Sequence, residues 1–267
     1  MLKKLLMTGA AGGVGKSLRP LLHRLAEQVL LSDIAEIDDL SPHETFRRCD
    51  LGDRGQVGAL FEGGVDGVLH LGGISLEKPF EQILNGNIVG VYNLFEAARH
   101  HDMPRIIFAS SNHVTGFYTR HERVDPAMPV RPDSLYGVSK VFGEGIASLY
   151  FDKFGQECLS IRIGWCFPKP VNPRTQAIWL GVEDLFDLCE RGFTAPRVGH
   201  TIIYGVSDNE EMWWDNSAVA FLGWKPHQSS AKWRSDVLTN MKPEKPTDPD
   251  VIYQGGHFAT SKHPNDE

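Results

Sequence analysis

The chain has 267 residues, enough to bury one large core, and its 27 basic and 34 acidic residues give a formal net charge of -7. This acidic balance argues against a surface for nucleic acid or for an anionic membrane, so we expect small-molecule partners. The four cysteines, Cys49, Cys158, Cys166 and Cys189, have no C-x-x-C spacing and no pairing with histidine, so we expect no disulfide framework, no metal site and a cytoplasmic location.

Strands and helices alternate along the first part of the chain. The apolar run 5–8 predicts a buried strand, and it reaches Gly9 too early for the apolar core of a signal peptide. No apolar run is long enough to span a bilayer. Residues 13–25 have helical spacing, and Pro20 within them predicts a kink or an early break because proline removes a backbone hydrogen bond. Strands are predicted at 29–33, 46–49 and 67–71, and one long helix at 80–101.

The same alternation continues through the middle of the chain and then weakens. A strand at 105–109, a helix that carries Tyr136 and a strand at 159–163 predict a parallel sheet covered on both faces, an α/β fold of the doubly wound Rossmann type. Pro168, Pro170 and Pro173 predict a loop. A helix at 182–191 and a strand at 201–205 follow, and a tail with Pro243, Pro246 and Pro249 predicts mostly irregular structure.

A glycine-rich turn follows the first predicted strand and opens the first helix. Its residues Gly9, Gly12, Gly13, Val14 and Gly15 would let the backbone approach a pyrophosphate at the positive end of that helix. Taken alone, the pattern describes a tight turn without a ligand equally well. The next strand end decides between the two interpretations.

Asp33 ends the second predicted strand, 18 residues after Gly15. An acid that bonds the adenosine ribose is expected about 20 residues after such a turn, so the pair favours a dinucleotide over a turn-capping aspartate. The carboxylate would repel a 2′-phosphate, and Ile34 and Ala35 supply no arginine to hold one. The sequence therefore favours NAD over NADP.

Two further strand ends add candidates for the cofactor site. Asp50 and Leu51 are placed to meet the adenine, and Leu71 with Gly72 and Gly73 leaves room for a ribose, although a plain loop is the alternative for the two glycines. Asn87, in the long predicted helix, is better explained as a buried polar residue that bonds the backbone.

Tyr136 and Lys140 stand one helical turn apart and share a helix face. A nearby ammonium favours the phenolate over the phenol, whose pKa is normally about 10, so Tyr136 could act as a general base. We expect Lys140 also to bond the nicotinamide ribose, with the positive charge of the oxidised ring assisting. The alternative is a half-buried ring beside a solvated lysine, and the upstream dinucleotide turn argues against it.

Polar residues close the fifth predicted strand at the edge where ligands bind in open α/β sheets. Ser111 is a candidate to hydrogen-bond the substrate oxygen that Tyr136 deprotonates, whereas Ser110 is expected to be a capping residue. His113 is either a substrate contact or a polar loop residue. Arg174, in the predicted proline-broken loop, suits a carboxylate, with a solvated surface arginine as the alternative.

Ser75, just past the fourth strand's glycines, could bond a sugar hydroxyl or cap the next segment. Together these motifs resemble the short-chain dehydrogenase/reductase superfamily. Longer strings resemble the uronate dehydrogenase family over nearly the whole chain: 70–75 (HLGGIS), 77–84 (EKPFEQIL), 110–113 (SSNH), 150–157 (YFDKFGQE) and 213–216 (WWDN).

The resemblance implies NAD-dependent oxidation at C1 of cyclic galacturonate or glucuronate to an aldarolactone. It also implies that the subunits associate into a homo-oligomer and that five residues contact the sugar acid: Ser75, Ser111, Asn112, His113 and Arg174. One departure matters, because Trp165 stands where the family has a serine after the sixth strand. The hydroxyl contact made by that serine is not carried over.

Only about a hundred residues follow the sixth predicted strand, which suits a small substrate better than a nucleotide sugar. We therefore expect one NAD-binding domain over 1–267, with 164–267 supplying the substrate-covering segments and the irregular tail. Two alternatives are an epimerase that retains its NAD and a regulator that only senses NAD. A regulator would not need Tyr136 and Lys140, so their joint presence counts against it.

Overall fold

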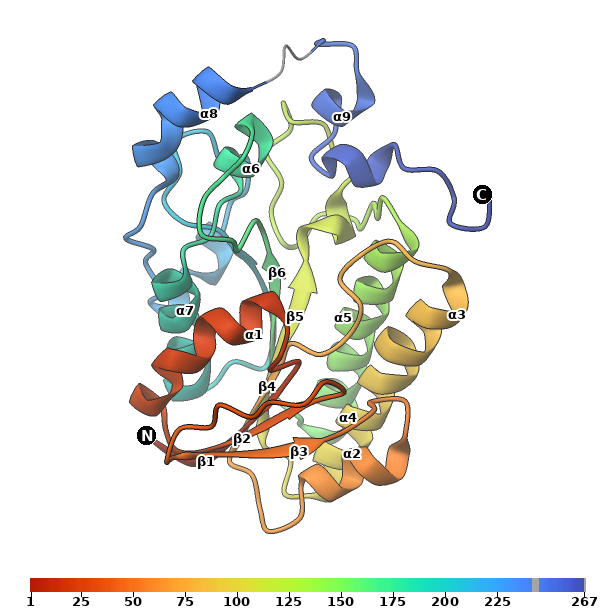
Figure 1. The fold of residues 1–267 in the computed structure, drawn as a ribbon, viewed down its shortest axis with the longest axis vertical. Coiled ribbons are helices and arrows are strands. Elements are labelled where there is room, and N and C mark those ends of the chain that lie inside the picture. Colours follow the sequence, from red (N-terminus) through yellow and green to blue (C-terminus); the bar gives the residue numbers. More distant parts are fainter. Residues whose placement is uncertain (242–244, 267) are drawn as a thin grey trace.

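The computed structural model describes residues 1–241 and 245–266, so Pro243 of the predicted irregular tail lies outside the described residues. Seven parallel strands form one sheet in the order β3-β2-β1-β4-β5-β6-β7 (Figure 1). This order reverses direction between β1 and β4, as in a Rossmann-type doubly wound sheet, and confirms the predicted fold class. The strands are β1 (Leu2–Thr8), β2 (Ala26–Asp33), β3 (Glu44–Arg48), β4 (Gly67–His70), β5 (Arg105–Ser111), β6 (Cys158–Ile163) and β7 (His200–Gly205).

The strand register brings the functional strand ends to one edge of the sheet. Thr8 at the end of β1 pairs with Ser32 of β2 and with His70 of β4. Ser111 at the end of β5 pairs with Ile163 of β6. The segments that follow these strands therefore meet at the carboxyl edge.

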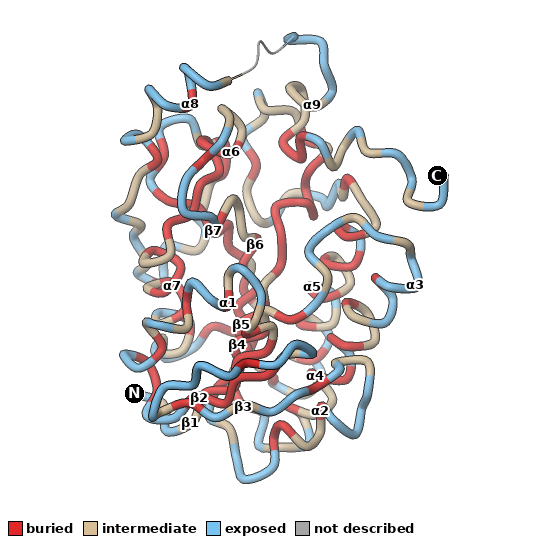
Figure 2. The backbone as a smooth tube through the Cα atoms, in the orientation of Figure 1, coloured by how far each residue is buried: buried red, intermediate tan, exposed pale blue. Residues whose placement is uncertain are grey.

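Helices cover both faces of the sheet, and the strands β4 to β7 are largely buried between them (Figures 1 and 2). The edge strand β3 is mostly exposed. On one face, α1 (Gly13–Leu18) and α7 (Val182–Thr194) pack against one apolar cluster. On the other face, α2 (Arg54–Leu60), α4 (Gly90–His100) and α5 (Leu135–Phe154) enclose a second. Burial of the strands on both faces explains why they appear in the sequence as continuous apolar runs.

Two irregularities in the helices have identifiable causes. The helix predicted over 13–25 leaves α-geometry at Leu18 and continues as a 3₁₀ segment, Arg19–Arg24, with Pro20 in its first turn, which confirms the predicted break. The long helix predicted over 80–101 is α3 (Phe80–Ile83), a π-helical stretch Leu84–Val89, and α4. Such π-helical turns occur often beside functional sites.

The carboxy-terminal part is more ordered than predicted. Pro173 does not lie in a loop but occupies the first turn of α6 (Pro173–Ala177), where proline loses no hydrogen bond, and Asn172 caps this helix. After β7 most of the described residues are irregular, as predicted, but several short helices lie among them. These are Ser217–Leu222, Ser230–Trp233, α8 (Arg234–Asn240), α9 (Pro249–Ile252) and Gly256–Ala259.

Helices α6, α8 and α9 gather at one end of the molecule, beyond the carboxyl ends of β5 and β6 (Figure 1). Among the residues that the structure describes, no helix is long and apolar enough to cross a membrane.

Candidate active site

A cleft of about 660 Å³ opens at the carboxyl edge of the sheet, where the strand order reverses. Ligands of open α/β sheets bind at this position. Every predicted cofactor residue except Tyr136 and Lys140 lines the cleft, together with Ser75: Gly9, Gly12, Gly13, Val14, Gly15, Asp33, Asp50, Leu51, Leu71, Gly72 and Gly73.

The glycine turn has the shape that a pyrophosphate requires. Gly9 has φ +73°, and a Cβ there would lie 2.6 Å from the backbone of Leu71 and Gly72. A Cβ at Gly15 would lie 2.4 Å from the Gly9 carbonyl oxygen, whereas one at Gly13 would meet open space. The first-turn N–H groups of α1 have no acceptor within the helix, so they are available to a phosphate. The residues therefore fit the predicted dinucleotide.

Asp33 ties the glycine turn to the end of β2. Its Oδ2 accepts a hydrogen bond from the Ala11 amide at 2.9 Å, and its Oδ1 accepts one from the Ala35 amide at 3.1 Å. A carboxylate can accept about four hydrogen bonds, so capacity remains for ribose hydroxyls. Ser32, Cys49, Gln82 and Asn85 also line the cleft, but no sequence motif identifies them.

Asn87 has the structural role predicted for it. Its side chain is buried, accepts from the Ile74 amide at 2.7 Å and donates to the Ile74 carbonyl oxygen at 2.9 Å. A third bond, at 2.9 Å, reaches the Ser139 hydroxyl on α5. Asn87 thereby fixes the loop after β4 against the helix that carries Tyr136.

Tyr136 and Lys140 are buried on α5, so the alternative with a solvated lysine is wrong. Lys140 Nζ lies 5.7 Å from the centre of the Tyr136 ring and donates to the Ala109 carbonyl oxygen at 2.8 Å. Burial raises the pKa of Tyr136 to about 12 and outweighs a hydrogen bond with Ser111 that lowers it. Burial also lowers the pKa of Lys140 to about 8. The prediction that Lys140 makes this phenol unusually acidic is therefore wrong for the chain by itself, because desolvation dominates.

The amino terminus of α5 is held by two acceptors. Ser134 caps the helix by accepting from the Gly137 amide at 2.9 Å. The Glu77 carboxylate accepts from the amides of Leu135 and Tyr136 at 3.0 and 2.9 Å. Glu77 lies in the segment after β4, so it couples the edge of the cofactor cleft to Tyr136.

The two serines of β5 face different surroundings. Ser111 accepts from the His113 amide at 3.2 Å and hydrogen-bonds Tyr136. Ser110 is not the expected capping residue, because its hydroxyl donates to buried Glu144 at 2.6 Å. Glu144 also accepts two hydrogen bonds from buried Arg162, each at 2.9 Å. Ser110 therefore belongs to a buried ion-pair network behind the reacting centre.

The predicted substrate residues Asn112, His113 and Arg174 lie together beside Tyr136. Arg174 stands on α6 and is not a solvated surface residue, because its Nε donates to the Gln254 carbonyl oxygen at 2.6 Å. The Asn112 side-chain amide is oriented by two hydrogen bonds. Its oxygen accepts from the Arg174 guanidinium at 3.1 Å, and its nitrogen donates to the Ile163 carbonyl oxygen at 3.1 Å. Burial lowers the pKa of Arg174 to about 10, so it remains cationic at neutral pH.

His113 is buried in the 3₁₀ turn Asn112–Thr115 and is not exposed in a loop. Its Nδ1 lies 2.7 Å from Asp133 Oδ2. The Phe258 ring stacks on the His113 ring with 3.9 Å between centroids. Sequence reasoning missed Asp133, Gln254 and Phe258, and no motif marks any of the three.

The aromatic residues left unexplained by the sequence have structural contacts. Trp214 is buried, stacks on Tyr204 at 4.6 Å and donates to the Gln254 side chain at 2.9 Å, so it supports the segment that holds Arg174. Trp165 donates to the Lys169 carbonyl oxygen at 3.0 Å and packs on Phe167.

The chain matches known proteins over nearly its whole length. Residues 5–169 match the model of the "NAD dependent epimerase/dehydratase family". The chain is 51% identical to a uronate dehydrogenase of Pseudomonas putida, over 97% of this chain and 96% of that protein. It belongs to the uronate dehydrogenase family.

Solved structures of the uronate dehydrogenase family agree with the fold. The crystal structure of a glucuronic acid dehydrogenase from Chromohalobacter salexigens has a TM-score of 0.98, is 52% identical and covers 100% of both chains. A tyrosine-to-alanine mutant of the uronate dehydrogenase from Agrobacterium tumefaciens, complexed with NAD, has a TM-score of 0.95 at 48% identity and covers 98% of both chains. The resemblance predicted from the sequence strings is confirmed.

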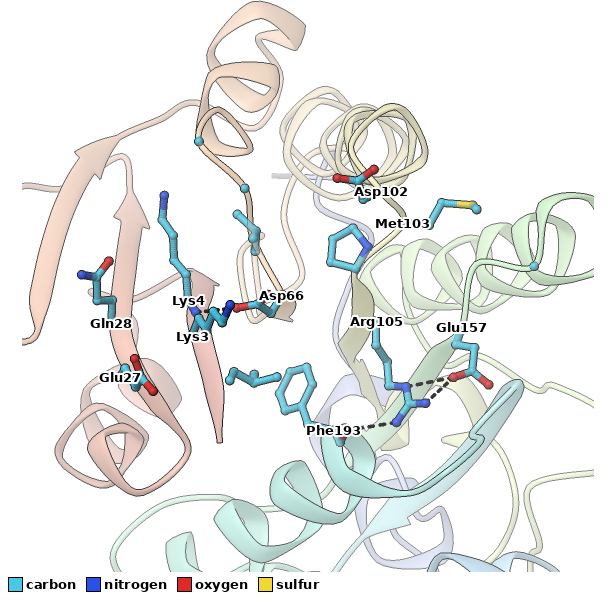
Figure 3. Close-up of a pocket in the computed structure, with 16 residues that line it drawn as sticks. Lys3, Lys4, Glu27, Gln28, Asp66, Asp102, Met103, Arg105, Glu157 and Phe193 are labelled. Atoms are coloured by element: carbon cyan, nitrogen blue, oxygen red, sulfur yellow. Dashed lines mark hydrogen bonds and ion pairs between the residues drawn. The ribbon is translucent and has the colours of Figure 1, made fainter.

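A second cavity, of about 760 Å³, lies around Lys4, Asp66, Arg105 and Glu157 at the opposite, amino-terminal edge of the sheet (Figure 3). Three of its charged groups have protein partners: Asp66 accepts from the Lys4 backbone amide at 2.7 Å, and Arg105 pairs with Glu157. In open α/β sheets of this kind ligands bind at the carboxyl edge, so we do not assign the reaction to this cavity. Among residues 1–241 and 245–266, no cluster of three or more His, Cys, Asp or Glu residues is arranged to hold a metal ion.

Proposed function

We propose that this protein is an NAD-dependent dehydrogenase that oxidises a hexuronic acid, galacturonate or glucuronate, at C1 to the aldarolactone. One observation carries the proposal. Ser111, Tyr136 and Lys140 lie close to Asn112 and Arg174, beside the cleft that the glycine turn and Asp33 line. Uronate dehydrogenases about 50% identical over nearly the whole chain support it.

The cleft residues would hold the NAD. The turn from Gly9 to Gly15 would bind the pyrophosphate and Asp33 the adenosine ribose hydroxyls, with Asp50 and Leu51 against the adenine. Leu71, Gly72 and Gly73 would border the ribose, and Lys140 would bond the nicotinamide ribose. NAD, when bound, accepts the hydride from C1 and adds the positive charge of the oxidised nicotinamide.

Tyr136 would remove the proton of the C1 hydroxyl, while Ser111 hydrogen-bonds the same oxygen. Because the pKa of Tyr136 is about 12 in the chain alone, the phenol needs further stabilisation of its ionised form near neutral pH. Lys140, one turn away, supplies a positive charge in surroundings where little water screens it. The proton leaves through Tyr136 as the C1–H bond breaks.

Arg174 would bind the substrate carboxylate, and Ser75, Asn112 and His113 would bind ring hydroxyls. Arg174 keeps its charge, but the fold has already removed most of the water around it. Binding a carboxylate of matching geometry therefore costs little further desolvation of the guanidinium. Ser75 is exposed at the cleft edge and caps no described helix, which leaves its hydroxyl available.

The test is NADH absorbance after galacturonate, glucuronate and neutral aldoses are added to the protein with NAD. We expect NADH with the uronates, whereas an NAD-retaining epimerase yields no net NADH and a sensing regulator binds NAD without turnover. Tyr136→Phe should still bind NAD and lose about 10²- to 10⁴-fold in turnover. A variant that turns over at the wild-type rate would exclude Tyr136 as the base.

We further propose that residues 1–267 act as one NAD-binding domain with 164–267 covering the substrate, and that the chain forms a homo-oligomer in the cytoplasm. The four free, buried cysteines support a reducing compartment. Light scattering of the purified protein measures the subunit number, and a monomer at working concentrations would contradict the oligomer.

A further inference from the structure

Asp133 is a buried carboxylate three residues before Tyr136, and its side chain is 0% exposed. Its Oδ2 lies 2.7 Å from His113 Nδ1, and its Oδ1 accepts from the Ser134 hydroxyl at 2.8 Å. Ser134 is the cap of α5, so one short segment connects the catalytic helix to His113. Asp133 takes no part in the proposed proton and hydride transfers.

Two glycines confine the Asp133 carboxylate. A Cβ at Gly116 would lie 1.7 Å from Asp133 Oδ2, and a Cβ at Gly255 would lie 1.8 Å from it. The Gly255 amide donates to the Gly116 carbonyl oxygen at 2.8 Å, which joins the carboxy-terminal segment to the turn after β5. The carboxylate therefore occupies a slot made by two backbones and has little freedom to rotate.

This geometry determines which ring nitrogen of His113 carries hydrogen. An ionised carboxylate only accepts hydrogen bonds, so the hydrogen must lie on Nδ1. Burial lowers the pKa of His113 below its ordinary value, and the neutral ring then has an unprotonated Nε2. Stacked Phe258 on one side and the Tyr136 ring edge, 5.8 Å away between centroids, restrict rotation of the imidazole.

We infer that Asp133 is a positioning residue that fixes His113 as a hydrogen-bond acceptor for a substrate hydroxyl and leaves the carboxylate to Arg174. The inference rests on the proposed function and divides the recognition of the sugar acid between the two residues. An unprotonated Nε2 can only accept a hydrogen bond, so it cannot bind a carboxylate oxygen, which also only accepts. A guanidinium only donates and therefore can bind one. Asp133 also favours the cationic form of Arg174 through its charge.

The inference is tested on the protein with NAD bound, by ¹⁵N NMR of labelled histidines, with His113 assigned from a His113→Gln variant. We expect a protonated Nδ1 and a bare Nε2 in the wild type. In Asp133→Asn the Ser134 hydroxyl retains the side-chain oxygen as its acceptor, and the amide N–H₂ faces Nδ1. The hydrogen of the imidazole should then move to Nε2, which becomes a donor.

The kinetic readout separates positioning from folding. Asp133→Asn should raise KM for the uronate by up to about tenfold, change kcat much less and leave KM for NAD unchanged, because the substrate hydroxyl can no longer donate to Nε2 and must turn to accept from it. A deoxy-uronate that lacks the recognised hydroxyl should show no such penalty. Asp125→Asn is the matched control, because Asp125 caps a turn in the same loop through Ala127 and Met128.

A hydrogen on Nε2, or a doubly protonated ring, in the wild type would overturn the inference whether or not the Asn variant folds. An unchanged tautomer in a folded Asp133→Asn would do the same. The tautomer is measured without turnover, so a failure of the inference is distinguishable from a failure of the proposed function, which shows as the absence of NADH.

Discussion

The buried ion pair of Glu144 and Arg162 lies behind the proposed active site, and we expect it to contribute strongly to the stability of the fold. Their side chains are 6% and 1% exposed, and Arg162 reaches both Glu144 oxygens at 2.9 Å. In Glu144→Gln one oxygen becomes an N–H₂ group that faces a guanidinium donor, and the arginine charge is left unpaired. Breaking such a pair from one side costs about 3–5 kcal/mol.

For a chain of this length, 1 kcal/mol shifts the midpoint of thermal unfolding by about 2 °C, so we expect Glu144→Gln to lower Tm by about 6–10 °C. Calorimetry of the protein without NAD measures the shift. The control is Glu183→Gln, which breaks a pair with Arg24 at 2.9 Å whose side chains are 40% and 44% exposed. That surface pair contributes about 0–1 kcal/mol.

The reasoning would be refuted if Glu144→Gln lowered Tm no more than Glu183→Gln does. A second variant distinguishes charge from packing: in Glu144→Leu with Arg162→Met the buried charge is gone, and we expect part of the lost stability to return. Ser110 loses its acceptor in that variant, so recovery should be incomplete.

Three further predictions concern catalysis. Arg174→Ala should lower kcat/KM for uronates about tenfold to a hundredfold through a charge-assisted bond worth about 1.5–3 kcal/mol, and steady-state assays should show far less effect on neutral aldoses. Asp33→Ala combined with Ile34→Arg should raise kcat/KM for NADP relative to NAD, since the repulsion is removed and a phosphate ligand added; an unchanged ratio would exclude Asp33 from the ribose site. The oxidation rate should rise as pH increases, because burial raises the pKa of Tyr136 to about 12 and the ionised fraction of the phenol grows at every pH below that value. In Lys140→Met the rise should begin at higher pH, and a pH profile that overlaps the wild type would show that the ammonium does not assist the phenol.

The pattern of apolar runs and turn residues along the sequence was enough to predict much of the fold. Apolar runs followed by glycine turns placed the strands, because a strand buried on both faces must be apolar throughout. The break at Pro20 and the buried role of Asn87 were also predictable, since both depend on the chemistry of one residue type in a helix. The residues of the cofactor cleft came from strand ends, which meet at one edge in any parallel sheet.

The substrate side depended on contacts between distant segments. Arg174 and Gln254 are 80 residues apart, and Trp214 and Gln254 are 40 apart, so no periodicity in the sequence marks these partners. Phe258 reaches His113 only because the carboxy-terminal segment folds back over the turn after β5, and Asp133 reaches it across a loop of 20 residues.

Burial accounts for the remaining difference between sequence and structure. The spacing of Tyr136 and Lys140 determined that the two side chains share a helix face, and it predicted a lowered phenol pKa. Only the tertiary structure decided how much water surrounds them, and desolvation moves the pKa of Tyr136 up and that of Lys140 down. Residue identity and spacing set which groups can interact, whereas packing sets the dielectric in which they do so.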